Sequence, residues 1–180
     1  PFSNLLDSVR GGLWKRSEAS VVGVDVGSST MKVVQARKTA SRAVLETYGA
    51  IALGPYGGVS AGQAVILSQE KLAEALRDLL AGASVTATEA VFAIPLRSSL
   101  IMVMELPKIT EHELKEMIPL EARKYVPIPI SEVELDWTVI PKRGGEDGKT
   151  EVLVVAIEKN TLTSYGRLAE SVKIEPKYFE

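Results

Sequence analysis

The stretch that most constrains the fold of this chain is VVGVDVGSSTMKVVQ, from Val21 to Gln35. Two runs rich in β-branched residues flank a short turn that contains a glycine and three hydroxyl side chains. A third run, AVLETYGAIAL, follows after a polar segment, and runs of this composition are typical of strands. We therefore predict a three-stranded meander whose first turn lies at Gly27.

The residues around this first turn are suited to holding a phosphate and its cation. Asp25 ends the first strand, where one carboxylate can hold Mg²⁺ through water, because Mg²⁺ retains much of its hydration. Gly27 lets the backbone approach a phosphate without a Cβ atom in the way. Lys32 lies on the second strand and can offset phosphate charge.

Hydroxyl residues fill the turn itself. Ser28, Ser29 and Thr30 offer hydroxyl and backbone N–H donors, and a concave turn of such donors binds anions. The same string also suits an ordinary hairpin turn beside a surface lysine, because short motifs have high false-positive rates. The apolar strands on both sides of the turn favour the phosphate site.

After the meander the chain continues with a Gly-rich loop, a helix and another strand. Ser68 is a suitable N-cap for a helix whose apolar face ends near Gly82. Together with the strand EAVFAIP, these elements complete a predicted first unit over residues 21–97. The preceding residues 1–20 show interrupted helical spacing, which favours a docked helix or a flexible terminus over an interfacial membrane anchor.

A second unit is predicted over residues 98–174. It begins with the strand LIMVMEL and a helix opened by a capping box of Thr110 and Glu113. Pro119 predicts a bend in that helix, since proline removes one hydrogen bond and clashes with the preceding turn. Two strands, VELDWTVI and EVLVVAI, and a closing helix follow. Residues 175–180 alternate as at the start of another strand of the first unit, and we expect the natural chain to continue beyond Glu180.

Composition excludes several classes of function. The 21 Lys and Arg residues are balanced by 23 Asp and Glu, giving a net charge of −2 and no support for nucleic-acid binding. The absence of cysteine excludes disulfides and thiolate metal sites, and it fits a cytoplasmic protein. His112 is the single histidine, which argues against a histidine metal cluster or a Ser-His-Asp triad. No apolar run is long enough to predict a transmembrane segment.

The sequence resembles a known family in two places. GVDVGSSTMKVV is similar to the first phosphate motif of the actin-like ATPases, a superfamily that includes actin, Hsp70, sugar kinases and FtsA. The longer segment MELPKITEHELKEMIPLEARKYVPIPISEVELDWTVI resembles the insert of the PilM family of type IV pilus assembly proteins, which is FtsA-like. EVLVVAIEKNTL and SVKIEPKYFE are also similar to that family, so the resemblance covers Val21 to Glu180.

This resemblance implies an α/β fold: an actin-like ATPase (ribonuclease H-like) subdomain with an inserted FtsA-like strand-helix-strand-strand subdomain. It implies an ATP-binding scaffold that is cytoplasmic, peripheral at the inner membrane and self-associating, with other pilus platform and motor proteins as partners. A PilN-like inner-membrane protein would place its N-terminal peptide in a groove between the two subdomains. The ATP phosphates would bind the turn residues and Lys32, and Asp25 would hold Mg²⁺ through water.

Only one side of a nucleotide site is present in this sequence. Actin-like proteins complete the site with a second hairpin motif and a Gly-rich adenosine motif, and residues 36–180 contain neither. We therefore expect the chain to hold about the first half of such a protein and to bind ATP weakly or not at all. No general base for hydrolysis is evident, so ATPase activity is not expected of this chain alone and stays open for the longer protein.

Three alternatives share parts of this pattern. An FtsA-type cell-division protein is related, but the amino-acid sequence of the insert favours the pilus family. A sugar or small-molecule kinase shares the first phosphate motif, yet it needs a substrate base that is not apparent. A pseudo-ATPase, in which nucleotide only stiffens the domain, is not separable from the scaffold by sequence.

Four further residues receive a structural interpretation. We expect Glu121 and Asp136 to lie on solvated faces and Trp137 to belong to a core or an interface. His112 is expected to be exposed near the start of the insert helix and to have no role.

Overall fold

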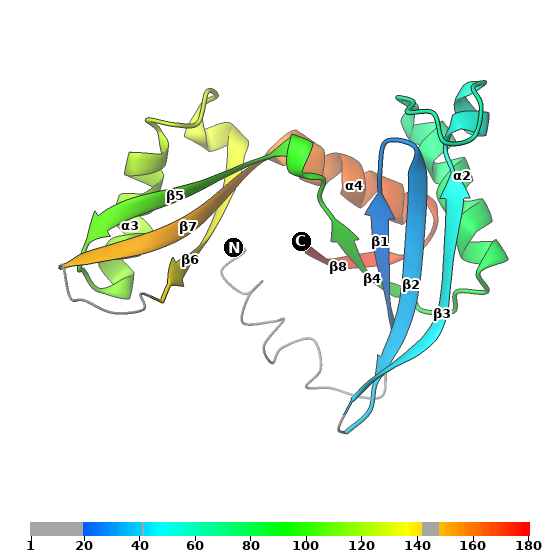
Figure 1. The fold of residues 1–180 in the computed structure, drawn as a ribbon, viewed down its shortest axis with the longest axis horizontal. Coiled ribbons are helices and arrows are strands. Elements are labelled where there is room, and N and C mark those ends of the chain that lie inside the picture. Colours follow the sequence, from blue (N-terminus) through cyan, green and yellow to red (C-terminus); the bar gives the residue numbers. More distant parts are fainter. Residues whose placement is uncertain (1–19, 41, 142–147) are drawn as a thin grey trace. The chain divides into compact units, whose positions relative to one another are not determined.

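The computed structural model describes residues 20–40, 42–141 and 148–180 (Figure 1). The described residues form two compact units. One unit contains residues 20–95 and 162–180, and the other contains residues 96–161. The expectation for residues 1–20 lies, apart from Ser20, outside the described residues.

The first unit is built on a five-stranded sheet, here called sheet A, with the order β3-β2-β1-β4-β8. The first three strands form an antiparallel meander, which confirms the prediction, and β4 and β8 extend the sheet in parallel to β1. The strands are β1 (Ser20–Val26), β2 (Thr30–Lys38), β3 (Ala43–Ala52), β4 (Glu89–Ala93) and β8 (Glu175–Phe179). A 3-10 helix, η3 (Gly54–Gly57), and the helix α2 (Gln69–Gly82) connect β3 to β4.

The core of this unit lies on one face of sheet A, where α2 and α4 (Lys159–Ser171) cover the strands (Figure 1). Alternate residues of β1 and β2 point into this core, as period-two spacing requires. Phe92 on β4 is fully buried and contacts the rings of Tyr165 and Phe179 at centroid distances of 5.8 Å and 6.2 Å. One face of sheet A is therefore packed, and the opposite face carries the remaining side chains.

Gln35 is the one polar residue among the buried side chains described, with 3 % of its surface exposed. Its Oε1 accepts hydrogen bonds from the backbone N–H groups of Thr86 and Ala87 at 2.8 Å and 2.9 Å. Its Nε2 donates to Glu46 at 2.8 Å and to the Thr86 hydroxyl at 3.0 Å. These four bonds join β2 to β3 and to the segment before β4. Leaving a buried partner of this amide unpaired would raise the free energy of the folded protein, so the bonds hold these segments together.

Glu46 accepts hydrogen bonds from three side chains at the end of sheet A. Ser20, Gln35 and Arg37 donate to its carboxylate at 2.5 Å, 2.8 Å and 2.8 Å. Hydrogen bonds from Ser20, then Gln35, then Arg37 favour the charged form and lower the pKa of Glu46 from 4.5 to about 2.

This lowered pKa predicts a loss of stability in acid. Because the folded-state pKa lies below the unfolded value, the contribution of Glu46 is complete above about pH 4.5 and is lost as the pH falls toward 2. Chemical denaturation at a series of pH values should show the free energy of unfolding falling more steeply over this range in the wild type than in Glu46→Gln. Equal slopes for the two proteins would contradict the assignment.

The second unit contains a three-stranded antiparallel sheet, here called sheet B, with the order β5-β7-β6. The helix α3 packs on one face of it (Figure 1). The elements are η4 (Leu96–Ser98), β5 (Ser99–Pro107), α3 (Glu111–Ala122), η5 (Ile130–Glu132), β6 (Val133–Ile140) and β7 (Lys149–Glu158).

The helix α3 begins as the sequence predicts. The Thr110 hydroxyl accepts from the Glu113 backbone N–H, and the Glu113 carboxylate accepts from the Thr110 backbone N–H, so the capping box is complete. The Thr110 hydroxyl also donates to the Glu113 carboxylate at 2.7 Å, and this bond, together with the one from the Thr110 backbone N–H, lowers the pKa of the Glu113 carboxyl below its usual value. Pro119 lies inside α3, which continues to Ala122 as a single helix. Leu114 and Ile118 are buried against the strands.

The closing helix, α4, packs mainly in the core of sheet A and not in the inserted unit, where the predicted boundaries placed it. We placed residues 98–174 together in the inserted unit, whereas the second compact unit runs from Leu96 to Thr161. Leu168 and Ala169 of α4 are buried in the core of sheet A, so the greater part of this helix belongs to the first unit. The spacing of apolar residues shows that a helix has a buried face, but not which sheet that face covers.

Candidate functional site

The turn between β1 and β2 is tight and requires glycine at its first position. The Gly27 N–H donates to the Thr30 carbonyl oxygen at 3.0 Å. A Cβ atom at Gly27 would lie 2.7 Å from that same oxygen, which is closer than such atoms approach in folded proteins. The glycine therefore permits a hairpin turn that any larger residue would have to open.

The following loop holds this turn through its carbonyl groups. The Leu53 N–H donates to the Ser29 carbonyl at 2.8 Å, and the Val65 N–H donates to the Ser28 carbonyl at 2.9 Å. Neither the backbone N–H nor the hydroxyl of Ser28 or Ser29 donates to another residue in the part of the chain that the structure describes. The carbonyl oxygens are thus hydrogen-bonded within the protein, while the N–H and hydroxyl donors remain available. An anion binds to such donors.

Asp25 and Lys32 face one another across the base of the hairpin. They are register partners on β1 and β2, and Lys32 Nζ lies 3.0 Å from Asp25 Oδ2. Their side chains keep 46 % and 60 % of their surface exposed, so the pair contributes only about 0–1 kcal/mol. Either group can leave the other for a ligand at little cost.

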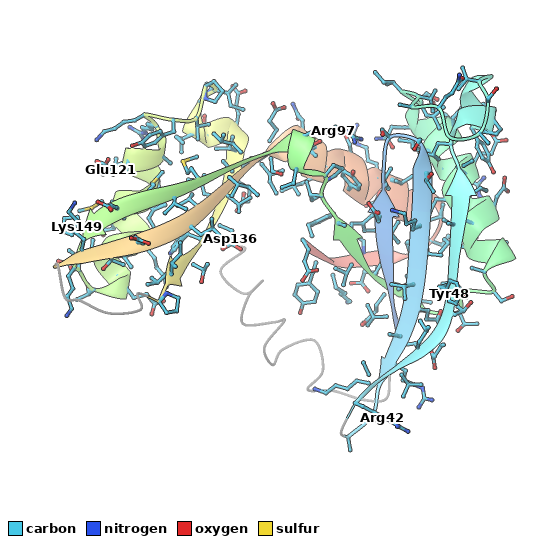
Figure 2. The ribbon with its side chains drawn as sticks, viewed as in Figure 1. Arg42, Tyr48, Arg97, Glu121, Asp136 and Lys149 are labelled. Atoms are coloured by element: carbon cyan, nitrogen blue, oxygen red, sulfur yellow. The ribbon has the colours of Figure 1, made fainter. Side chains whose placement is uncertain are left out.

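A hollow of about 550 Å³ adjoins this pair on sheet A. Its walls are mainly apolar and include Gly23, Val34 and Tyr48, with Asp25 and Lys32 also in the lining. Tyr48 on β3 is 73 % exposed (Figure 2). Most residues of its lining, such as Val34 and Tyr48, alternate with the buried ones, so the hollow lies on the face opposite the helices.

All six residues predicted for the phosphate and Mg²⁺ site lie on one hairpin. Asp25 and Lys32 stand on its two strands, while Gly27, Ser28, Ser29 and Thr30 form the turn and the start of β2. The anchoring by Leu53 and Val65 was not predicted, because both residues are far from the turn along the chain. The signal available was the Gly-rich segment after β3, where a Cβ at Gly54 would overlap the carbonyl oxygen of Ser60.

The residues of the second unit are mostly structural. His112 is exposed, as predicted, and Glu121 pairs with Lys124 at 2.7 Å. Trp137 packs against the core between sheet B and α3, as predicted. Asp136 is only partly exposed, and burial raises the pKa of its carboxyl (Figure 2).

A second, smaller hollow of about 350 Å³ lies within the second unit. Leu100, Val126 and Ile128 give it apolar walls, and Arg97 and Glu158 contribute one charge of each sign. Its lining therefore combines apolar contact with both charges, a mixture suited to a peptide side chain beside a polar backbone.

Two classes of site are not found among the residues described. Residues 20–40, 42–141 and 148–180 contain no group of three or more His, Cys, Asp or Glu side chains placed to hold a metal ion. Over the same ranges no helix is long and apolar enough to cross a membrane. A divalent cation at Asp25 would therefore need oxygen atoms from water or from a bound phosphate.

The family model described as type IV pilus assembly protein PilM matches residues 23–180, which include the hairpin and both sheets. This chain belongs to the PilM family. This match supports the pilus family rather than the division-protein or kinase alternatives. It also covers the segment between β5 and β6, where the resemblance was most specific.

Solved structures agree with this PilM assignment at the level of fold. A PilM-PilN type IV pilus biogenesis complex matches with a TM-score of 0.73 and 24 % identity, covering 92 % of this chain and 47 % of that one. The cytoplasmic domain of EpsL, an inner-membrane component of the Vibrio cholerae type II secretion system, matches with a TM-score of 0.56 and 12 % identity. That match covers 89 % of this chain and 57 % of the EpsL chain.

These likenesses confirm the expected mixed α/β fold. The chain spans about half the length of these solved relatives.

Proposed function

We propose that this PilM-family chain supplies one side of an ATP site in a cytoplasmic scaffold of the type IV pilus machine, peripheral at the inner membrane. The observation that carries the proposal is the β1–β2 turn, whose carbonyls are anchored and whose Ser28 and Ser29 donors are available. The family match supports a place in pilus assembly. The scaffold would link membrane partners to other platform and motor proteins.

The residues present fit a phosphate group and a hydrated cation. The N–H groups and hydroxyls of Ser28 and Ser29, with the Thr30 hydroxyl, would receive phosphate oxygens. Lys32 would offset phosphate charge, and Asp25 would hold Mg²⁺ through water. The Asp25–Lys32 pair is exposed and weak, so separating it for these contacts costs about 0–1 kcal/mol. ATP would supply the phosphates, and Mg²⁺ would neutralise part of their charge.

This arrangement predicts weak, phosphate-dependent binding by the 180-residue chain. In ¹H–¹⁵N NMR spectra, Mg-ATP should shift the amide resonances of Ser28 and Ser29, whereas adenosine should leave them in place. The affinity should be millimolar, because the residues described supply one hairpin only. Gly27→Ala should remove the shifts, since its Cβ would meet the Thr30 carbonyl oxygen, whereas Gly82→Ala, where a Cβ meets no atom within 4 Å, should retain them.

Two outcomes would reject this part of the proposal. Micromolar affinity for Mg-ATP would show that a complete site exists within these 180 residues. Shifts confined to residues away from the β1–β2 turn, or unchanged in Gly27→Ala, would show that the turn does not hold the phosphates.

We also propose that the chain binds the N-terminal cytoplasmic peptide of a PilN-like membrane protein. The solved relative with the higher TM-score of the two is a PilM-PilN complex, which supports this partner class. Calorimetric titration with such a peptide should show binding that survives Asp25→Ala, because the peptide site is distinct from the phosphate turn. Ile128→Asp tests the smaller hollow, and we expect it to weaken binding at least tenfold by placing a charge in an apolar wall.

The phosphate-site proposal and the peptide-binding proposal can be rejected independently of each other. Absence of peptide binding in every nucleotide condition would reject the partner and leave the phosphate site standing. Peptide binding that is lost in Asp25→Ala would contradict the separation of the two sites.

A further inference from the structure

The edge of sheet B formed by β5 is long, regular and apolar. Within the described residues β5 pairs with β7 on one side, and β7 pairs with β6 on the other (Figure 1). The pairing of β5 with β7 runs from Ser99 to Pro107 without a register shift. Its central residues, Leu100 to Met104, have the sequence LIMVM and carry no charge. We call these five residues the β5 edge.

Strand edges are normally protected against pairing with another chain by charges, proline, bulges or shortness. Each of the other sheet edges in the described chain has such a feature. β6 carries Glu134 and Asp136, β8 is short and contains Pro176 and Lys177, and the β2–β3 pairing has a register shift after Gln35. In β5, Glu105 and Pro107 lie at the end of the strand, outside the five residues of the β5 edge. Those five residues have none of these features, and their exposed side chains are apolar.

Two exposed side chains of the β5 edge, those of Ile101 and Val103, lie on the face of sheet B opposite α3. Ile101 is 46 % exposed and Val103 is 58 % exposed, while Met102 and Met104 pack against the core. Ile101 and Val103 stand opposite Val155 and Leu153 of β7, so the apolar surface continues across two strands. Near the end of β5, Glu105 is paired with Lys149 at 2.7 Å, so its charge is compensated.

We propose that the β5 edge is a self-association surface, on which β5 of a second copy of this chain pairs in antiparallel register about a two-fold axis at Met102. Antiparallel pairing of one strand with its own copy is isologous, so a single sequence must be complementary to itself. In this register Ile101 stands opposite Val103 of the second copy, and Leu100 stands opposite Met104. Every central cross-strand pair is then apolar.

The charges near the β5 edge agree with this register. Glu105 falls opposite Ser99 of the second copy. The two Glu105 side chains are therefore kept apart. Self-pairing of β6 would instead bring Glu134 and Asp136 of two copies together, which is unfavourable. This contrast selects β5, rather than β6, as the self-pairing edge.

The first test compares two matched lysine substitutions by sedimentation velocity over a range of protein concentrations. The wild-type protein should form a dimer as concentration rises. Val103→Lys should remain monomeric, because each copy would place a lysine opposite Ile101 of the other. Val139→Lys on β6, where the side chain is 47 % exposed, should dimerise like the wild type. A wild type that stays monomeric, or equal behaviour of the two variants, would overturn the proposal.

The second test examines the register and uses the absence of cysteine from these 180 residues. In Met102→Cys the two cysteines face each other with Cα atoms about 4.5–5.5 Å apart, which suits a disulfide. In Val103→Cys the equivalent atoms are diagonal neighbours about 7–8 Å apart, beyond the usual range. Met102→Cys should therefore cross-link faster on mild oxidation. Random collisions would favour the more exposed Val103→Cys, and that result would overturn the register.

Discussion

Phe92→Ala is expected to lower the free energy of unfolding of the first unit by about 3–5 kcal/mol, a large part of the 5–15 kcal/mol typical of a domain. Phe92 on β4 is fully buried and contacts Tyr165 from α4 and Phe179 from β8. Removing its ring leaves a cavity whose walls come from elements far apart in the sequence, so collapse can fill it only in part. Native-state hydrogen exchange of peptides from β1 and β4 would measure the loss.

Tyr48→Ala is the matched control for this substitution. Tyr48 is an aromatic residue of the same sheet, but it is 73 % exposed, so its removal should change stability by no more than about 0.5 kcal/mol. A loss in Phe92→Ala no larger than that of Tyr48→Ala would show that the ring does not support the core.

Gln35→Leu is expected to destabilise the same unit by about 2–4 kcal/mol. The substitution removes the acceptor for the Thr86 and Ala87 N–H groups, and each unpaired donor costs about 1–2 kcal/mol where water is excluded. It also removes one of the hydrogen bonds to Glu46. The increase in apolar character at position 35 does not compensate, because the lost partners are backbone groups that cannot move away. Chemical denaturation would measure the change.

The control for this prediction is Gln63→Leu. Gln63 also accepts a backbone N–H, that of Ser60 at 3.2 Å, but it is exposed, so water can replace the bond. The effect should stay within about 0.5 kcal/mol. If both leucine variants lose equal stability, the burial of the Gln35 network is not the cause of its contribution.

Most secondary structure was predictable because it depends on neighbours along the chain. The meander, the Ser68 N-cap and the Thr110–Glu113 capping box all follow from residues within a few positions of each other. The six candidate phosphate-site residues were found for the same reason, since they occupy one hairpin. Local chemistry was sufficient wherever one turn or one cap decided the conformation.

The partners of buried groups were not predictable in this way. In the sequence, Gln35 looks like an ordinary polar residue on a strand. In the structure it is buried, and its amide oxygen accepts hydrogen bonds from backbone N–H groups more than fifty residues later. The apolar face of α4 was evident, but its place in the core of sheet A was not.

The sequence by itself determined the elements, the β1–β2 turn and the family resemblance, because these depend on short-range residue patterns. Only the tertiary structure decided that the Ser28 and Ser29 carbonyls are held by Leu53 and Val65, and that Leu100 to Met104 form a sheet edge. The physical reason is that hydrogen-bond partners and edge positions depend on which distant segments meet. The spacing of residues along the chain does not show which distant segments will meet.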